Sequence, residues 1–167
     1  MLSVKRTCVA LLTLLLIVSM LSATVSATSD SHSRSDGAGV YTCYSANSLS
    51  ATPAAYNYIN YNAQASSTLS WPGTAYPPQS ATISVSGHVD QYWNSPSGRF
   101  LGTLWSDSRQ SSFLSSVQIS HSASNIWHPV GWALCFFTHH DYYVVPHGGG
   151  TPYHIYYDLQ PSVLYYV

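Results

Sequence analysis

The chain has 167 residues, which is enough for one domain and short for two. Hydrophobic residues make up 46% of it and suit a globular core, whereas charged residues make up only 7%, far below the ~25% of ordinary soluble domains. A formal net charge of −1 excludes a basic nucleic-acid-binding protein and an acidic tail protein, and an aromatic content of 14% argues against disorder.

The N-terminal segment has the pattern of a secretory signal peptide. Lys5 and Arg6 supply a positively charged start, residues 9–18 form a short apolar run, and residues 25–27 are small enough for signal peptidase. The apolar run is shorter than the ~20 residues of a membrane span, which disfavours a membrane anchor. We therefore predict a secreted, extracellular protein with residues 1–27 as its signal peptide.

Cleavage of 27 of the 167 residues would leave 140 residues with an unusual set of ionisable side chains. Three Arg and six Asp give a charge of −3 while histidine is neutral, and protonation of all eight His would raise it to +5. Because an unperturbed histidine titrates near pH 6.5, the surface is expected to change sign between about pH 7 and pH 5. The alternative is that histidine only replaces lysine and glutamine as a polar side chain.

Two cysteines, Cys43 and Cys135, remain after the signal peptide. An even pair in an exported chain predicts one disulfide bond between them. It would close a loop of roughly ninety residues. In the chain-entropy model such a loop contributes on the order of 4–5 kcal/mol to stability. The alternative is two free thiols.

The start of the remaining chain is expected to carry little regular structure. Residues 28–38 are small and polar, and they predict a flexible leader ahead of the domain. Residues 53–80 are rich in Asn, Tyr, Ser and Pro, and they are compatible with one strand followed by a long loop. Such a loop could carry binding function or could only cover the surface.

Residues 81–93 show the clearest strand pattern. Ile83 and Val89 fall on one face of an extended chain, and His88 and Asp90 fall on the other. This alternation predicts a half-buried antiparallel strand. Further strands are expected at residues 99–105, 114–121, 130–145, 153–159 and 162–167, with turns at 95–98 and 146–152.

The composition favours strands over helices throughout. After residue 27 the chain contains no Glu, Lys or Met, while Ser, Thr, Tyr and Val are abundant. Short strands with closely spaced turns predict an all-β domain over residues 39–167. We expect an antiparallel β-sandwich, immunoglobulin-like or jelly-roll-like, or a small barrel.

The carboxylates do not mark an active site. Asp90, Asp107, Asp141 and Asp158 show no spacing typical of a glycosidase pair. The chain has no Gly-x-Ser-x-Gly turn, and no Lys follows the glycines at 148–150 as a phosphate-binding loop requires. A non-catalytic protein is favoured, although serine and histidine are frequent enough for a catalytic triad.

A zinc or copper site is the sharpest chemical hypothesis. His88 and Asp90 are two residues apart, as are His139 and Asp141, so each pair shares one face of a strand. Two such pairs brought together would supply four ligands. The alternative is that each histidine hydrogen-bonds a neighbour on the solvent face. A copper site on Cys135 is disfavoured, because no Met is available as the axial ligand.

The aromatic side chains predict a binding surface. Five Trp and fourteen Tyr exceed the needs of one small core, and exposed rings bind sugars or anchor protein partners. Trp71, Tyr76, Trp127 and His128 lie in loop-like segments and are the candidate binding residues. The favoured function is a secreted, non-catalytic module that binds carbohydrate or protein at a cell surface, with no nucleic-acid partner and no required cofactor.

Two other functions stay open. A secreted antimicrobial or toxin would contact membranes through surplus aromatic rings and the positive charge that histidine gains in acid, although the chain has no cationic amphipathic helix. An envelope or filament subunit would pair its apolar C-terminal segment, residues 163–167, with the edge of another copy.

Overall fold

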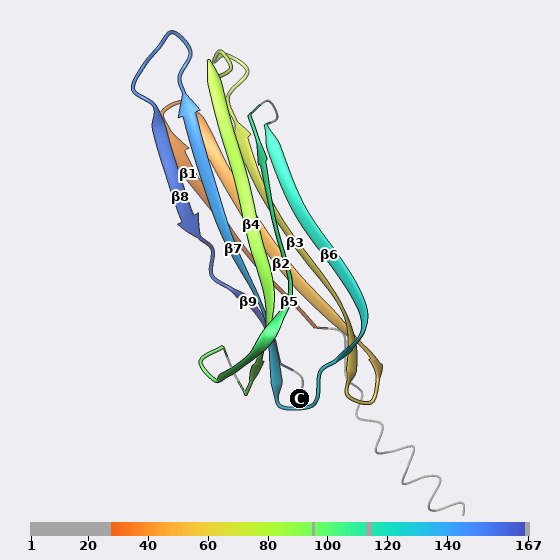
Figure 1. Ribbon diagram of the computed structural model, residues 1–167. Helices are drawn as coiled ribbons and strands as arrows, with labels where there is room; N and C mark the ends of the chain where they lie inside the picture. The colour runs from red at the N-terminus through yellow and green to blue at the C-terminus, as the bar shows by residue number, and fades with distance from the viewer. Residues whose placement is uncertain (1–27, 95, 113–114, 166–167) are drawn as a thin grey trace, which may run out of the picture.

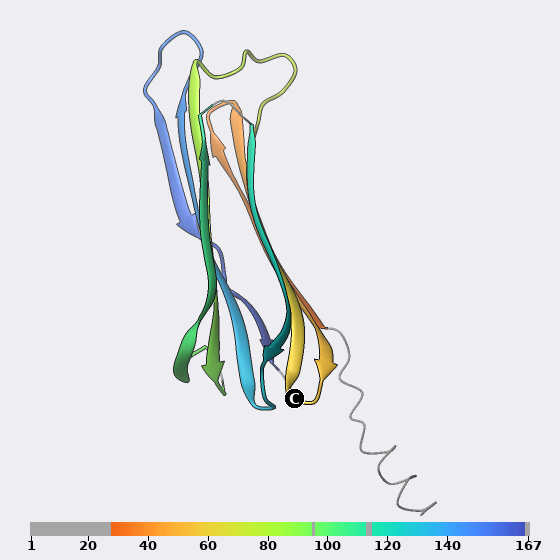
Figure 2. The same ribbon diagram turned by 45° about the vertical axis from the view of Figure 1, so that its right-hand side comes forward.

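The computed structural model describes residues 28–94, 96–112 and 115–165. In this part of the chain the strands form two antiparallel sheets that lie face to face as long layers (Figure 1, Figure 2). The predicted all-β class is confirmed, and no hydrogen-bonded ladder closes these described strands into a barrel. The same residues include no apolar helix of membrane-spanning length. The predicted signal peptide, residues 1–27, lies outside the described part.

The two layers are named here sheet A and sheet B. Sheet A has the strand order β1-β2-β3-β6, with β1 (Thr28–Ala38), β2 (Tyr41–Ala55), β3 (Tyr58–Ser70) and β6 (Ser116–Trp127). Sheet B has the order β5-β4-β7-β8, with β4 (Ser80–Trp93), β5 (Arg99–Ser111), β7 (Trp132–Val145), β8 (Tyr153–Asp158) and β9 (Ser162–Tyr165). Each strand that the sequence predicted after residue 80 corresponds to one of the strands β4 to β9.

One edge of β7 is shared by two strands. β8 pairs with residues 139–144 of β7, and β9 pairs with residues 133–136 on the same edge, because β4 occupies the other edge. Pro161 lies in the link between β8 and β9 and has no N–H to donate, so it cannot continue the ladder. Phe137 and Thr138 therefore have no ladder partner in β8 or β9, and at Thr138 the link covers the edge of β7 only by a hydrogen bond from the Leu159 amide to the Thr138 carbonyl at 3.3 Å.

The space between the sheets is filled by alternate residues of the long strands. In β4, Ile83, Val85 and Val89 are fully buried, as the alternation predicted, while His88 is exposed. Gly87 lies in the same inward row. A Cβ atom there would come within 2.9 Å of both the Phe136 ring and a backbone oxygen, so the packing of β4 on β7 requires glycine at this position.

A network of buried polar side chains crosses between the sheets. The Ser67 hydroxyl donates to the Ser84 carbonyl, so it accepts from Nδ1 of His140 at 2.8 Å. The Thr138 hydroxyl accepts from the Asn47 amide and lies 3.2 Å from Nε2 of His140, to which it donates. The buried imidazole is therefore held neutral with its proton on Nδ1. Burial lowers the pKa of His140 to about 4.

Residues 28–38 are not a flexible leader but the edge strand β1. All eleven residues pair with β2, from Thr28 opposite Ala51 to Ala38 opposite Tyr41. The chain alternates two polar classes here, so no hydrophobic period indicated a strand. Contacts distant in sequence hold it: the Val163 amide donates to Asp30 at 2.8 Å, and the Arg34 guanidinium lies over the Tyr157 ring.

The segment expected to contain a long loop is mostly strand. β2 and β3 form a hairpin across residues 56–57, and apart from that turn only residues 71–79 of the segment lie outside strands. Asn57 has a φ of 60°, a left-handed conformation that asparagine tolerates better than most residues. A long loop was expected because these strands are rich in asparagine and proline at their ends.

The predicted disulfide bond between Cys43 and Cys135 is not formed, and both buried cysteines are free thiols. Cys43 points between the sheets, whereas Cys135 lies opposite Asp90 on the outward side of sheet B. The contact of Ser67 with His140 aligns the strands and sets the two cysteines on the order of 20 Å apart along them. A disulfide requires Cα atoms within about 7 Å, so the fold forbids this bond.

Candidate functional site

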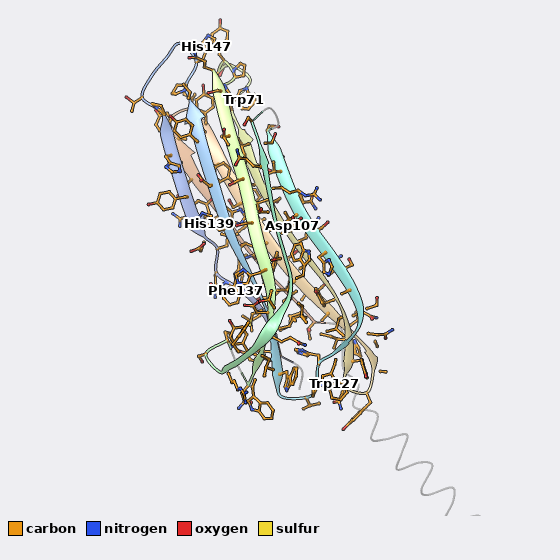
Figure 3. The ribbon with its side chains drawn as sticks, in the orientation of Figure 1. Trp71, Asp107, Trp127, Phe137, His139 and His147 are labelled. Atoms are coloured by element: carbon orange, nitrogen blue, oxygen red, sulfur yellow. The ribbon has the colours of Figure 1, made fainter. Side chains whose placement is uncertain are left out.

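The outward side of sheet B gathers histidine, aspartate and aromatic side chains along β7. Paired residues in an antiparallel sheet share a face, so the register of β4, β7 and β8 defines this surface. We call it the histidine strip, and its members are His88, Asp90, Phe137, His139, Asp141, Tyr143, His154, Tyr156 and Asp158. Figure 3 shows Phe137 and His139 along the middle of the molecule.

Two exposed histidine–aspartate pairs link β7 to β8. Nδ1 of His139 lies 2.8 Å from Oδ1 of Asp158, and Nε2 of His154 lies 2.9 Å from Oδ1 of Asp141. A carboxylate can only accept, so each imidazole donates. Each pair therefore fixes one carboxylate oxygen and leaves the other free for an additional donor.

A third pair joins the exposed His88 to a buried carboxylate. Nε2 of His88 lies 3.4 Å from Oδ2 of Asp90, which is only 5% exposed. The Thr103 hydroxyl donates to Oδ1 of Asp90 at 2.7 Å, and the Tyr92 hydroxyl donates to Oδ2 at 3.4 Å. This carboxylate is satisfied inside the protein and orients the ring of His88.

Aromatic rings lie between these pairs. The His88 ring stacks on Phe137, with ring centroids 5.1 Å apart and planes 18° apart. The His154 ring contacts Tyr143 and Tyr156 at centroid distances of 6.1 Å and 5.2 Å. Tyr156 is 65% exposed, so its ring face is available to a ligand.

A hollow of about 360 Å³ opens in the strip beside Phe137 and Thr138, where the pairing of β7 changes from β8 to β9. Its side-chain walls are the stacked His88 and Phe137 rings on one side and the His139–Asp158 pair on the other. Leu159, in the link between β8 and β9, adds an apolar border. The hollow thus joins flat ring faces to one oriented carboxylate, a combination able to hold a small polar ligand.

The four expected metal ligands do not converge. His139 and Asp141 each bond a partner on β8, and His139 lies opposite Ser86 rather than His88. Within residues 28–165 as described, no group of three or more His, Cys or Asp side chains could hold a metal ion. Asp158 and His154, which follow β7 in the chain, satisfy the side chains instead. Each histidine bonds a neighbouring carboxylate, as the alternative reading of these pairs proposed.

The four predicted binding residues lie at two ends of the molecule. Trp71 is near one end together with His147, and Trp127 is at the other (Figure 3). Tyr76 stacks on His147 with ring centroids 4.6 Å apart, and it is 71% exposed. Trp71 is half-buried against the core. The four residues therefore do not form one patch.

His128 is a structural residue. It is buried, with Nδ1 3.0 Å from the side-chain nitrogen of Gln91, which also donates to the Trp127 carbonyl. Burial lowers the pKa of His128 to about 4. Its place in a loop-like sequence did not reveal that its ring points inward.

No protein-family model matches the chain, and a search of curated proteins found no similar one. Functional evidence therefore comes from the site geometry. The sequence reasoning missed His154, Tyr156 and Asp158 as site residues. Their two-residue spacing was a usable signal, because it places all three on one side of a strand.

Proposed function

We propose that this protein is a secreted, non-catalytic binding module of the β-sandwich type that holds a carbohydrate on the histidine strip. The supporting observation is the hollow in which the stacked His88 and Phe137 rings face the exposed His139–Asp158 pair. Ring faces pack against the C–H faces of a sugar, and an oriented carboxylate accepts from its hydroxyl groups.

The size of the hollow favours a small ligand over a protein. Small-molecule sites typically occupy ~300–1,000 Å³, are largely apolar and contain few polar groups. The volume of about 360 Å³ is at the lower end of that range and fits one or two sugar units. A protein partner would instead be anchored by Tyr143 and Tyr156 outside the hollow.

The test is calorimetric titration of the protein with neutral oligosaccharides of glucose, mannose, galactose and N-acetylglucosamine. We expect binding of at least one of these, and at least tenfold weaker binding for Asp158→Asn and His139→Gln. The matched control is Asp107→Asn, which removes a carboxylate from an exposed pair with Arg109 on β5.

Two results would contradict the proposal. One is the absence of binding to every oligosaccharide by the unaltered protein. The other is an equal loss in Asp107→Asn and Asp158→Asn, because a general effect of lost charge would then explain the data. Circular dichroism of each variant confirms that the fold is retained.

A further inference from the structure

The outward side of sheet A is made of uncharged polar side chains. The register places one side chain in two on this side: residues 29–35 of β1, 42–52 of β2, 60–70 of β3 and 116–122 of β6. These positions hold only Ser, Thr, Asn and Gln, apart from Tyr44 and Ala46. We call this surface the hydroxyl face.

The hydroxyl face lacks charge because the ionisable residues of sheet A occupy the other row of their strands. Sheet A does contain ionisable residues, but Asp30, His32, Arg34 and Asp36 on β1 lie opposite the inward residues of β2, and His121 on β6 lies opposite the inward Ala63 of β3. The hydroxyl face has no Asp, Glu, Lys, Arg or His at its outward strand positions. Ordinary soluble surfaces carry ~25–35% charged residues of both signs, which keep copies apart and keep neutral partners hydrated.

A hollow of about 290 Å³ lies in the hydroxyl face where β1, β2 and β3 run side by side. Ala46, Tyr44, Ser48, Gln64 and Ser66 line it, together with His32 of β1, whose Nε2 lies 3.3 Å from Oδ2 of Asp30. Tyr44 is 44% exposed and offers a ring face. The Gln64 amide both donates and accepts, as do the serine hydroxyls, so these uncharged groups match a neutral hydroxyl-rich ligand.

A second hollow of about 220 Å³ lies on the same face, bordered by Ser50, Asn60, Asn62 and Ser122. Along β2, Ser50 is four residues from Ala46, which is ~13 Å at 3.3 Å per residue. Two uncharged hollows in line along the strands suit a polymer of repeated neutral units better than a single small molecule.

We propose that the hydroxyl face binds an uncharged polysaccharide, as a second site separate from the histidine strip. The occupant follows from charge complementarity. An anionic polymer or lipid headgroup finds no Lys or Arg at the outward positions of this face, where the one histidine at the hollow, His32, is paired with Asp30, and an apolar partner finds no apolar patch. A neutral polymer exchanges hydrogen bonds with water for hydrogen bonds with serine, threonine and amide groups, and leaves no charge desolvated.

The test is co-sedimentation of the full secreted protein with insoluble neutral polysaccharides: cellulose, chitin and an unbranched β-glucan. We expect binding to at least one of them, with affinity unchanged between 50 mM and 1 M NaCl because no charge takes part. Tyr44→Ala and Gln64→Ala should each weaken it at least tenfold. Both side chains are exposed, so these variants should fold, and circular dichroism checks this.

Tyr156→Ala is the control, since it removes a tyrosine that is also exposed, from the opposite sheet. Retained polymer binding in Tyr156→Ala with loss in Tyr44→Ala supports the proposal, whatever happens to oligosaccharide binding on the strip. The reverse pattern would assign the polymer to the histidine strip and overturn it. Binding to none of the polymers, or binding that falls with salt, overturns it too. So does a sedimentation velocity result in which the protein is a dimer and Tyr44→Ala is a monomer.

Discussion

The two outward faces of this protein share one architecture and differ in chemistry. Both are the solvent side of long antiparallel strands in which every second residue is buried. Sheet B presents histidine, aspartate and aromatic rings, whereas sheet A presents hydroxyl and amide groups without charge. This difference in chemistry is the basis for proposing a different ligand for each face.

The largest expected effect is a loss of folding stability in acid. It limits the pH range in which ligand binding by the two faces can be compared. Burial lowers the pKa values of His128 and His140 to about 4, below the 6.5 of an unfolded chain. The unfolded state therefore binds protons first, and stability that is complete above pH 6.5 is lost as the pH falls towards 4. Each histidine should cost about 3 kcal/mol at pH 4. Urea unfolding at pH 7.5 and pH 4.5 measures this loss.

A substitution identifies the source of that acid sensitivity. His140→Gln should remove about half of the pH dependence between pH 7.5 and pH 4.5, at the expense of lower stability at neutral pH. His139→Gln changes the adjacent exposed histidine and is the control. An unchanged pH dependence in His140→Gln would show that the interior network is not responsible.

The next prediction concerns the two thiols. Cys43 points between the sheets, and Cys135 lies on the outward side of sheet B. Burial raises the pKa of Cys43 to about 11 and that of Cys135 to about 12, above the model-compound value of 9.0. At pH 8 the thiolate fraction should fall about 100-fold or more. We expect two thiols to react with a colorimetric reagent only after denaturation. A denatured, unreduced protein 2 Da lighter than the reduced chain would contradict the free-thiol structure.

A smaller loss of stability is expected from a substitution in the core between the two sheets, at Gly87 in the inward row of β4. Gly87→Ala places a Cβ atom against the Phe136 ring and the Phe137 backbone oxygen. Overpacking of this kind typically costs ~1–3 kcal/mol. Thermal unfolding of Gly87→Ala measures it, with Gly102→Ala on β5 as the control because a Cβ there meets no neighbour within 4 Å. Equal losses would show that backbone freedom, not packing, is the cause.

The smallest change in stability is expected at the His139–Asp158 pair. A substitution there compares ligand binding by the two faces most directly. The His139–Asp158 pair is exposed, and surface pairs contribute at most ~1 kcal/mol. Asp158→Asn should therefore change the free energy of unfolding very little while it weakens oligosaccharide binding. Polymer binding by the hydroxyl face should not change. A large loss of stability in Asp158→Asn would make the pair structural rather than functional.

Strand prediction succeeded where polarity alternates with hydrophobicity. Ile83, Val85 and Val89 against His88 carry that signal, and β4 forms as expected. Strand prediction failed at residues 28–38. Serine alternates there with charged residues, so neither row of side chains is hydrophobic. It also failed for Cys43 and Cys135, because an even count of cysteines says nothing about how far apart the fold holds them.

The sequence by itself determined the all-β class, the strands after residue 80 and the inward and outward rows of β4, because side-chain direction in a strand repeats every two residues. Only the tertiary structure decided which rows meet. The strand register set His139 beside Asp158 and His154 beside Asp141, so residues expected to bind a metal form hydrogen-bonded pairs instead. The register also joined the outward polar rows of four strands into the hydroxyl face. Such pairings depend on backbone ladders between distant segments, which local patterns do not encode.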